Sequence, residues 1–399
     1  MNRYIFLTNS TRRIGGSQLY TARKIDWLEK NGWSTAVYYY NPGPIVINTL
    51  KRFKDNLIPQ LSLPFHIVSD TDRRKIIRRI GDGNYDKTII ESNETHLCIW
   101  GEYVAEATGG MNICYPLSES FPPLSTDEIG FFKKKLQANL LFGITDQSIP
   151  RMLGNCSEAQ NRGLAAVGNV EGNVIEDESY RMPDFVDGKT ILSIGRLDKP
   201  YIPDMISSIK KFIKAHLNDY FNVVLLGGAG DEELVKTILE ELNILSNVRA
   251  FCTGYLHPVP RLLIHKADVA IASAGCVLLS ANERILTVSV DAKDHKAIGI
   301  YGITTKNTIY RDSEPQQEIE QVLEDVLYNK IYEKDDVEVH LSKEADYSQH
   351  QAIIDRYVGG EAINIQWHLT GKQKLLRGIY TLMGVNNFKH LMNFWNKLR

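Results

Sequence analysis

The sequence is poor in the residues that metal centres and disulfide frameworks require. Its five cysteines are scattered and odd in number. Neither a Cys-x-x-Cys pair nor a cluster of cysteine and histidine supplies the ligand spacing of a zinc site. Most of the cysteines fall in apolar, strand-like runs, which predicts buried and reduced thiols in a cytoplasmic protein. We therefore expect no bound metal.

Long apolar runs and an excess of one charge are also missing. No apolar segment approaches the roughly 20 residues that a membrane-spanning helix needs. The short run Tyr4–Leu7 precedes polar and basic residues, which is typical of the first strand of a fold rather than of a signal peptide. A net charge of -2 and an isoelectric point of about 6.6 argue against binding of nucleic acid along a basic surface. We expect a cytoplasmic protein without a nucleic-acid partner.

Two common catalytic signatures do not occur either. Neither half of the chain carries Gly-x-Gly-x-x-Gly after its first predicted strand, which disfavours a dinucleotide-dependent dehydrogenase. No Ser, His and Asp arrangement stands out as a triad.

What is present is an alternation of short apolar segments with helical patterns, which predicts an α/β protein. One series of such segments runs from residue 1 to 172, and a second from 189 to 361. Between them, residues 173–188 have little periodicity and are predicted to be a linker. A chain of this length suits two domains, each with a doubly wound, mainly parallel sheet.

The final segment, residues 362–399, has no Asp or Glu but mixes Leu, Met, Phe and Trp with Lys and Arg. This composition predicts basic amphipathic helices that cross back to the first domain, lie on an anionic membrane surface, or both. A helix packed on the body with a solvated basic face explains the pattern equally well. We expect a cytoplasmic location with peripheral association at the inner face of the membrane as an open alternative.

Residues 191–200 form the most informative motif. A buried strand ends at Gly195, and Arg196 and Lys199 follow in the loop before a helical pattern. A helix N-terminus offers unpaired N–H groups and a positive dipole end to an anion. Two cations in one turn can neutralise a diphosphate, and Gly195 lets the backbone approach it. Taken alone, the motif is equally compatible with a charged surface loop.

Four motifs occur in one order along the chain. They are the Gly-Gly loop within Thr8–Ser17, the turn Gly195–Lys199, the glycine-rich strand end Val223–Gly230, and Asn247–Tyr255 followed by Lys266–Ser273. Together they resemble the GT-B glycosyltransferases, and within them the retaining family four, which uses nucleotide-sugar donors. The resemblance covers nearly the whole chain. It implies two Rossmann-like, doubly wound domains that face each other across a cleft.

The resemblance also implies roles for individual residues. Arg196 and Lys199 would stabilise the charge that develops on the leaving diphosphate, without a metal. Gly15 and Gly16 would approach that diphosphate from the other domain. Further donor contacts are implied at Gly195, at Thr253, Gly254 and Tyr255 for the base, and at Ser273, Gly275 and Cys276 for phosphate.

The sequence departs from the family's pattern at the residues that bind the donor sugar and at those on the acceptor side. The family's two Glu residues, which are separated by seven residues, are replaced by Ala272 or Ser273 and by Ser280. Glu283 is therefore the remaining candidate to bind the ribose or the sugar. The family's acceptor-side His is also missing, and Glu119 or Ser118 could face the cleft instead. A second polar cluster, Glu91, Asn93, Glu94 and His96, follows an earlier predicted strand, where α/β sheets bind ligands.

The sequence therefore predicts a hexosyltransferase-type enzyme, retaining and metal-independent, with no cofactor beyond its donor. Its partners would be a UDP- or GDP-linked sugar and a glycan or lipid-linked acceptor, in the assembly of capsule, exopolysaccharide or cell wall. One alternative is a GT-B subunit that has lost catalysis and binds or stabilises a partner glycosyltransferase. Another is a nucleotide-sugar epimerase.

Overall fold

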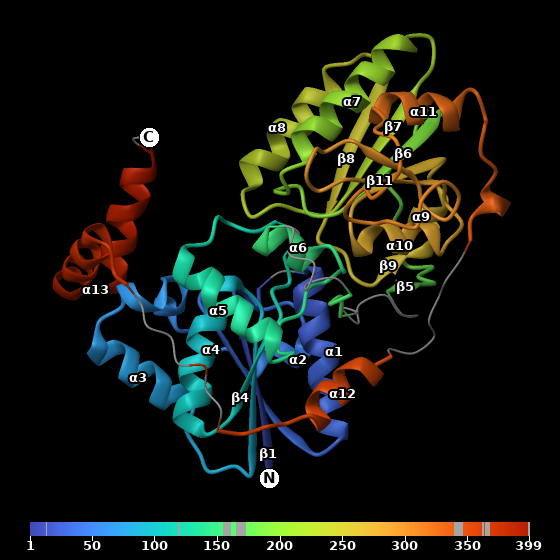
Figure 1. The fold of residues 1–399 in the computed structure, drawn as a ribbon. Helices are drawn as coiled ribbons and strands as arrows, with labels where there is room; N and C mark the ends of the chain where they lie inside the picture. The colour runs from blue at the N-terminus through green and yellow to red at the C-terminus, as the bar shows by residue number, and fades with distance from the viewer. Residues whose placement is uncertain are drawn as a thin grey trace. The chain divides into compact units, whose positions relative to one another are not determined.

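Figure 1 shows the protein as a computed structural model, which describes residues 1–12, 14–118, 120–154, 161–164, 173–338, 346–360, 363 and 368–397. The chain forms two compact units. Unit 1 comprises Met1–Val167 and Tyr347–Arg399, and unit 2 comprises Gly168–Asp346. The chain thus begins in unit 1, builds unit 2 and returns to unit 1.

Unit 1 is built on a parallel four-stranded sheet in the order β2-β1-β3-β4. Its strands are β1 (Asn2–Thr8), β2 (Trp33–Tyr39), β3 (Lys87–Ser92) and β4 (Met111–Cys114). Their side chains are buried on both faces, because the connecting helices cover both sides of a parallel sheet. The chain proceeds from β1 to β2 on one side and to β3 and β4 on the other. The carboxyl ends of β1 and β3 are therefore the switch point at which such sheets bind ligands.

The helices of unit 1 begin with recognisable capping residues. Ser69 caps α3, since its side chain accepts a hydrogen bond from the Asp72 N–H, and Ser125 and Glu128 form a complete capping box on α5. The helical elements of the unit are α1 (Gly16–Lys30), α2 (Asn48–Lys51), η1 (Pro59–Ser62), η2 (Phe65–Ile67), α3 (Asp70–Ile80), α4 (Thr95–Thr108), α5 (Thr126–Gln137), α6 (Ser148–Leu153), α12 (Ser348–Asp355) and α13 (Gly371–Lys397).

Two buried ion pairs connect the returning chain to the first part of unit 1. Lys24 Nζ lies 2.5 Å from Glu91 Oε2 and 2.9 Å from Nδ1 of His350 on α12. Lys135 Nζ lies 2.6 Å from Glu102 Oε2, and Oε1 of Glu102 accepts a hydrogen bond from the Ile363 N–H at 2.7 Å. Removing one member of such a pair leaves an unpaired charge in the interior, which is strongly destabilising.

Unit 2 contains a six-stranded sheet in the order β12-β11-β10-β6-β7-β8. Its strands are β6 (Lys189–Ile194), β7 (Phe221–Leu226), β8 (Val248–Gly254), β10 (Val269–Ala272), β11 (Thr287–Val290) and β12 (Ala297–Ile300). All pairs are parallel except β11 with β12. The short strands β5 (Val174–Ile175) and β9 (Val259–Pro260) form a separate parallel pair. As in unit 1, the sheet has a switch point, which lies between β6 and β10.

The helices of unit 2 pack on this sheet through continuous apolar faces. On α7, the buried residues Met205, Ile206, Ile209, Phe212 and Ile213 recur with helical spacing. The helical elements are α7 (Ile202–Ala215), α8 (Glu232–Asn243), α9 (Arg261–His265), α10 (Gly275–Ala281), α11 (Ile319–Leu327) and η4 (Lys334–Asp336).

The apolar runs 65–68 and 141–145 predict strands, and both predictions are wrong. The run 65–68 contains the 3-10 helix η2, in which Phe65 stacks on Tyr103 with ring centroids 3.8 Å apart. The segment 141–145 makes isolated bridges rather than a strand. The last predicted strand of unit 2, near residues 299–302, is present as β12 and runs antiparallel to β11. Short apolar runs do not distinguish these outcomes, because packing decides them.

Helix α13 packs on unit 1 and breaks at Gly384, where φ is 70° and ψ is 174°. Its buried anchors are Tyr380 and Phe388, which join the apolar cluster under α4 and η2. The amphipathic character predicted from the sequence is not confirmed, because large apolar side chains such as Leu382 also occur on the exposed side. Over the described ranges, none of the helices has the length and hydropathy needed to cross a bilayer.

Replacing Glu91 by Gln should lower the free energy of unfolding by about 3–5 kcal/mol, because Lys24 would be left as a buried, unpaired cation. Replacing Glu240, an exposed partner of Lys236, by Gln should change it by less than about 0.5 kcal/mol. Urea denaturation followed by circular dichroism measures both. The double variant Lys24→Met/Glu91→Gln should be less destabilised than Glu91→Gln alone. Equal losses in Glu91→Gln and Glu240→Gln would contradict the assignment.

Candidate functional site

The candidate site in unit 2 lies at the switch point of its sheet. Strand β6 has β7 and β8 on one side and β10 and β11 on the other. The loops that follow β6 and β10 therefore diverge, and open α/β sheets bind ligands at such places. Gly195 follows β6, and Ser273 follows β10. Two of the predicted segments thus meet at one edge of the sheet.

Glycine is required where the loops after β6 and β7 pack together. A Cβ added to Gly227, whose φ is +150°, would lie only 1.9 Å from the carbonyl oxygen of Gly195. Two backbone hydrogen bonds of 3.0 Å hold this contact, from the Gly195 N–H to Leu226 and from the Leu197 N–H to Gly228. The glycine-rich end of β7 therefore supports the Gly195 loop, and this structural role accounts for Gly227 without a ligand.

The turn after Gly195 has a buried anchor and an exposed cation. Leu197 is buried, whereas the side chain of Arg196 is 45 % exposed and its Nε lies 3.3 Å from Oδ1 of Asp198. Lys199 is half-buried, with Nζ 5.8 Å from the ring centroid of Tyr201, the residue that precedes α7. The predicted arrangement of two cations in the turn before a helix is thus present.

The end of β10 has a strained backbone and an unused hydroxyl. Ala274 has φ 59° and ψ -141°, a conformation that costs a non-glycine residue free energy and often marks a functional site. Ser273 is 1 % exposed, and its Oγ has no hydrogen-bond partner among the described residues. Buried hydroxyls are normally paired, so this atom is suited to a ligand or a water. Gly275 and Cys276 follow in the first turn of α10.

The residues predicted to hold a base lie at the end of β8, next to the glycines of β7. Gly254 has φ +68° and forms a bridge with Gly227. The ring of Tyr255 covers Gly228, because a Cβ added there would lie 2.8 Å from Cε2 of the tyrosine. The hydroxyl of Thr253 donates to the Gly254 carbonyl at 3.0 Å. Thr253, Gly254 and Tyr255 are therefore brought to the same edge as the Gly195 turn.

Glu283 and Ser280 are engaged elsewhere. Glu283 Oε2 lies 2.9 Å from both Arg261 Nε and His265 Nε2, and it follows the carboxyl end of α10, whereas Gly275 begins that helix. Ser280 is fully buried, and its Oγ accepts a hydrogen bond from Thr287 at 2.8 Å. The structure does not bring Glu283 together with Ser273.

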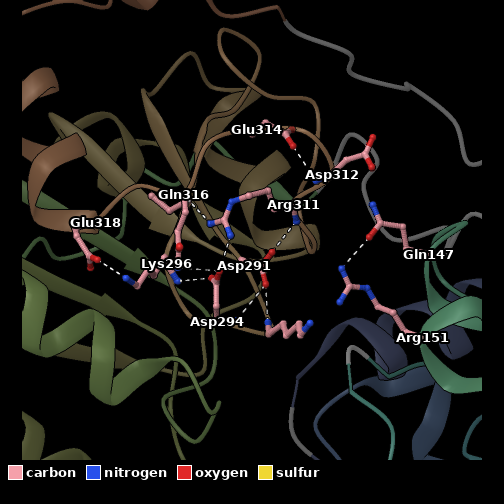
Figure 2. Close-up of polar contacts among 12 residues, drawn as sticks. Gln147, Arg151, Asp291, Asp294, Lys296, Arg311, Asp312, Glu314, Gln316 and Glu318 are labelled. Carbon is pink, nitrogen blue, oxygen red and sulfur yellow. Dashed lines mark hydrogen bonds and ion pairs between the residues drawn. The ribbon is translucent and has the colours of Figure 1, made fainter. Parts of the chain in front are cut away.

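A second loop lies across the ends of β10 and β11. The carbonyl of Thr308 accepts from the Ala274 N–H at 2.6 Å, and that of Asn307 accepts from Ser289 Oγ at 2.8 Å. Asp291 stabilises the loop by accepting from the N–H groups of Lys293 and Arg311 (Figure 2). Residues 303–311 could not be predicted as part of the site from the sequence. They lie close to Ser273 only because the chain after β12 turns back across the ends of β10 and β11, and no local pattern predicts that turn.

In unit 1, Gly15 and Gly16 stand at the start of α1. Among the described residues, no side chain caps this helix, and its first turn has no acidic residue, so its N–H groups suit an anion. A Cβ added to Gly16 would meet nothing within 4 Å, so packing inside unit 1 does not require glycine there. Gly15 is in extended backbone, with φ -159°.

The polar cluster after β3 divides into a structural part and an accessible part. Glu91 is buried and accepts hydrogen bonds from Tyr4 at 2.6 Å and from Tyr20 at 2.8 Å. Burial alone would raise the pKa of Glu91, but the charge of Lys24 and the hydrogen bonds from Lys24, Tyr4 and Asn93 outweigh it and lower the pKa. Glu94 is partly exposed, and its Oε2 accepts from Tyr40 at 2.7 Å.

His96 and Ser118 also have structural partners. Burial lowers the pKa of His96, whose Nε2 lies 3.0 Å from the Leu61 carbonyl. Ser118 Oγ donates to the Ser120 carbonyl. Glu119, the predicted acceptor-side acid, lies outside the described residues. Within the ranges that the structure describes, no group of three or more His, Cys, Asp or Glu residues could hold a metal ion.

No protein-family model matches the chain, and no curated protein is significantly similar to it in sequence. Solved structures do resemble it. HepE from Anabaena in complex with UDP and glucose is 13 % identical over 84 % of this chain and 91 % of its own, with a TM-score of 0.50. A glycosyltransferase from Rickettsia africae is 11 % identical over 97 % and 98 %, with a TM-score of 0.52.

A UDP-GlcNAc 2-epimerase from Neisseria meningitidis bound to UDP-GlcNAc is 14 % identical over 89 % of this chain and 98 % of its own, with a TM-score of 0.50. At these identities the likeness concerns the fold. The chain has the GT-B fold, with two Rossmann-like α/β units, as its sequence motifs predicted.

Replacing Gly227 by Ala should destabilise unit 2 by about 1–3 kcal/mol, since the new methyl group would collide with the Gly195 carbonyl and displace the turn that carries Arg196. Replacing Gly16 by Ala provides the matched control, because its Cβ would meet open space. Urea denaturation of the two variants beside the wild type measures the difference. A Gly227→Ala protein as stable as Gly16→Ala would show that the two loops do not pack as described.

Proposed function

We propose that this protein is a glycosyltransferase that moves a sugar from a UDP- or GDP-linked donor to a glycan or lipid-linked acceptor. The observation that carries the proposal is the turn after β6, where Arg196 and Lys199 precede a 14-residue helix. The neighbouring strand β10 ends at Ser273, whose buried hydroxyl has no hydrogen-bond partner among the residues that the structure describes. Cations, a helix start and a hydroxyl acting together are suited to a diphosphate. Gly254 and Tyr255, at the end of β8 on the far side of β7, would hold the base.

In the proposed reaction an acceptor hydroxyl oxygen bonds to the anomeric carbon of the donor sugar, while the bond from that carbon to the β-phosphate oxygen breaks. The nucleoside diphosphate leaves with the electron pair, and Arg196 and Lys199 stabilise its charge. The hydroxyl proton passes to the leaving phosphate oxygen, which corresponds to the retention of configuration that the resemblance implies. Two fixed cations supply positive charge without a metal. Gly15 and Gly16 of unit 1 would provide further backbone contacts to the diphosphate.

The residues that bind the donor sugar would differ from those that bind it in the family. Ser280 and Glu283 have structural partners, as described above, so they are poorly placed to bind sugar or ribose hydroxyls. The loop 303–311 crosses the ends of β10 and β11 beside Ser273 and is the better candidate. We propose that this loop contacts the sugar.

The cellular role that fits this chemistry is assembly of a surface polysaccharide such as capsule, exopolysaccharide or cell wall. The acceptor would then be a growing or lipid-linked glycan at the cytoplasmic face of the membrane. The tail without acidic residues supports a location at an anionic surface.

Two alternative functions have support of their own. The commitment of Ser280 and Glu283 to internal contacts favours a subunit that has lost catalysis and stabilises a partner glycosyltransferase. The epimerase from Neisseria meningitidis has the same fold, so an epimerase acting on the nucleotide sugar alone is the second alternative.

Isothermal titration should detect binding of UDP or GDP, and Arg196→Ala/Lys199→Ala should weaken it by about 100-fold, because two charge-assisted contacts to phosphate are lost. The matched control is Lys236→Ala/Arg249→Ala, which removes two exposed cations of unit 2 away from the Gly195 turn. If neither diphosphate binds the wild type, or if both double variants bind like it, the proposed site is incorrect.

A screen of common nucleotide sugars, followed by NMR, should separate the three functions. A transferase releases nucleoside diphosphate and leaves the sugar on an acceptor or on water, and the anomeric signal reports retention. An epimerase yields a new nucleotide sugar from the donor alone. Nucleotide binding without any turnover would favour the subunit that has lost catalysis.

A further inference from the structure

Helix α3 presents a row of cations on its exposed side. Arg74, Lys75, Arg78 and Arg79 are exposed and recur at helical positions i, i+1, i+4 and i+5, which share one face. The opposite face packs into unit 1 through the buried residues Ile76 and Ile80. Four cations on one side of an 11-residue helix make this a strongly basic part of the unit 1 surface.

The structure places α3 beside α13, which lies some 300 positions later in the chain (Figure 1). Arg377 on α13 binds Asp70, and the hydroxyl of Tyr380 donates to Asp72 Oδ2 at 2.8 Å. Both carboxylates belong to the first turn of α3. Contacts with α13 and with Arg73 therefore occupy the acidic residues of the first turn of α3. Of the four exposed cations, Arg79 donates to the Asp55 carbonyl at 2.6 Å.

Helix α13 leaves large apolar side chains in solvent although two others anchor it. Tyr380 and Phe388 are buried against unit 1. By contrast, Leu382 is 88 % exposed, Leu375 62 % and Phe394 59 %. Trp395 is also exposed. Leu375 and Leu382 are seven positions apart and therefore share one face of the helix, and exposed apolar side chains that gather on one face mark an interaction surface.

We infer that α3 and α13 together form a contact surface for anionic phospholipid. The cations of α3 would meet lipid phosphates, and Leu382, Phe394 and Trp395 would enter the boundary between headgroups and acyl chains. Basic residues beside exposed leucine and aromatic side chains are what an interfacial surface requires, and the absence of acidic residues after position 361 fits a negatively charged partner. Nucleic acid would use the cations but not the apolar residues.

The lipid contact would hold the enzyme where a lipid-linked acceptor lies, and for this purpose it rests on the proposed function. The sequence suggested the tail alone as a membrane contact. The structure adds α3, which carries more exposed cations than the described part of α13 offers near Leu382. The binding itself does not require turnover, so it can be measured separately from the proposed activity.

Sedimentation with vesicles tests the cationic part. The full-length protein should bind vesicles of phosphatidylcholine with about 30 mole per cent phosphatidylglycerol at roughly physiological salt. This binding should weaken at higher salt, and vesicles of pure phosphatidylcholine should not be bound. The variant Arg74→Gln/Lys75→Gln/Arg78→Gln should bind about 100-fold more weakly, since each cation near an anionic surface contributes about fivefold. The charge-matched control Lys211→Gln/Lys214→Gln/Lys236→Gln, on α7 and α8 of unit 2, should bind like the wild type.

Two further variants test the apolar part. Leu382→Ser/Phe394→Ser should weaken vesicle binding about tenfold, because two side chains no longer leave water for the interface. Leu217→Ser/Ile244→Ser removes two exposed apolar side chains of unit 2 and should have no effect. Brominated lipid should quench wild-type tryptophan fluorescence more than that of Trp395→Phe. All of these changes spare Tyr380 and Phe388, so circular dichroism should show helix α13 retained.

The inference is overturned if the wild type does not bind the anionic vesicles, if it binds neutral vesicles equally well, or if the unit 2 controls lose as much binding as the α3 and α13 variants. The nucleotide titration is run on the same preparations. Nucleotide binding without vesicle binding refutes the lipid surface and leaves the proposed activity intact. Vesicle binding without nucleotide binding supports the lipid surface and refutes the proposed nucleotide site.

Discussion

The close approach of Gly227 to the Gly195 carbonyl determines where the candidate residues of unit 2 lie. No side chain larger than hydrogen fits at position 227, so the loops after β6 and β7 can pack directly against each other. Leu197 then anchors the turn in the core, which leaves Arg196 at the surface. Because parallel strands end at the same edge, Tyr255 and Ser273 arrive beside this turn without any direct bond to it. The backbone contact thus fixes the loops after β6 and β7, and the parallel strand order brings the ends of β8 and β10 to the same edge.

Unit 1 depends on a different kind of interaction. Two lysine–glutamate pairs are almost fully buried, and each also holds a group from the returning chain, His350 or the Ile363 N–H. Such pairs add little net stability compared with apolar packing, but they tolerate few alternative arrangements. These pairs therefore favour one segment, the returning chain with His350 and Ile363, as the part that completes unit 1.

The sequence predicted the fold where local pattern and tertiary packing agree. Strand β6 and the turn at Gly195 lie in one continuous segment, so apolar run, glycine and cations could be interpreted together. Strand β12 shows the limit, because an apolar run carries no information about direction. Glu91 shows another: a carboxylate at a strand end suggests a ligand site, yet Lys24, 67 positions earlier, neutralises it. Glu283 likewise has partners, Arg261 and His265, that no spacing rule connects to it.

The order of the segments makes unit 2 an insertion within unit 1. A ribosome completes residues 1–167 and then 168–346 before it supplies the last segment of unit 1. That segment contributes Ile353, Ile354, Tyr380 and Phe388 to the apolar interior. Domains generally fold as units during synthesis, so unit 2 can mature while unit 1 still exposes apolar surface. A chain that ended before residue 347 would therefore lack part of the apolar interior of unit 1.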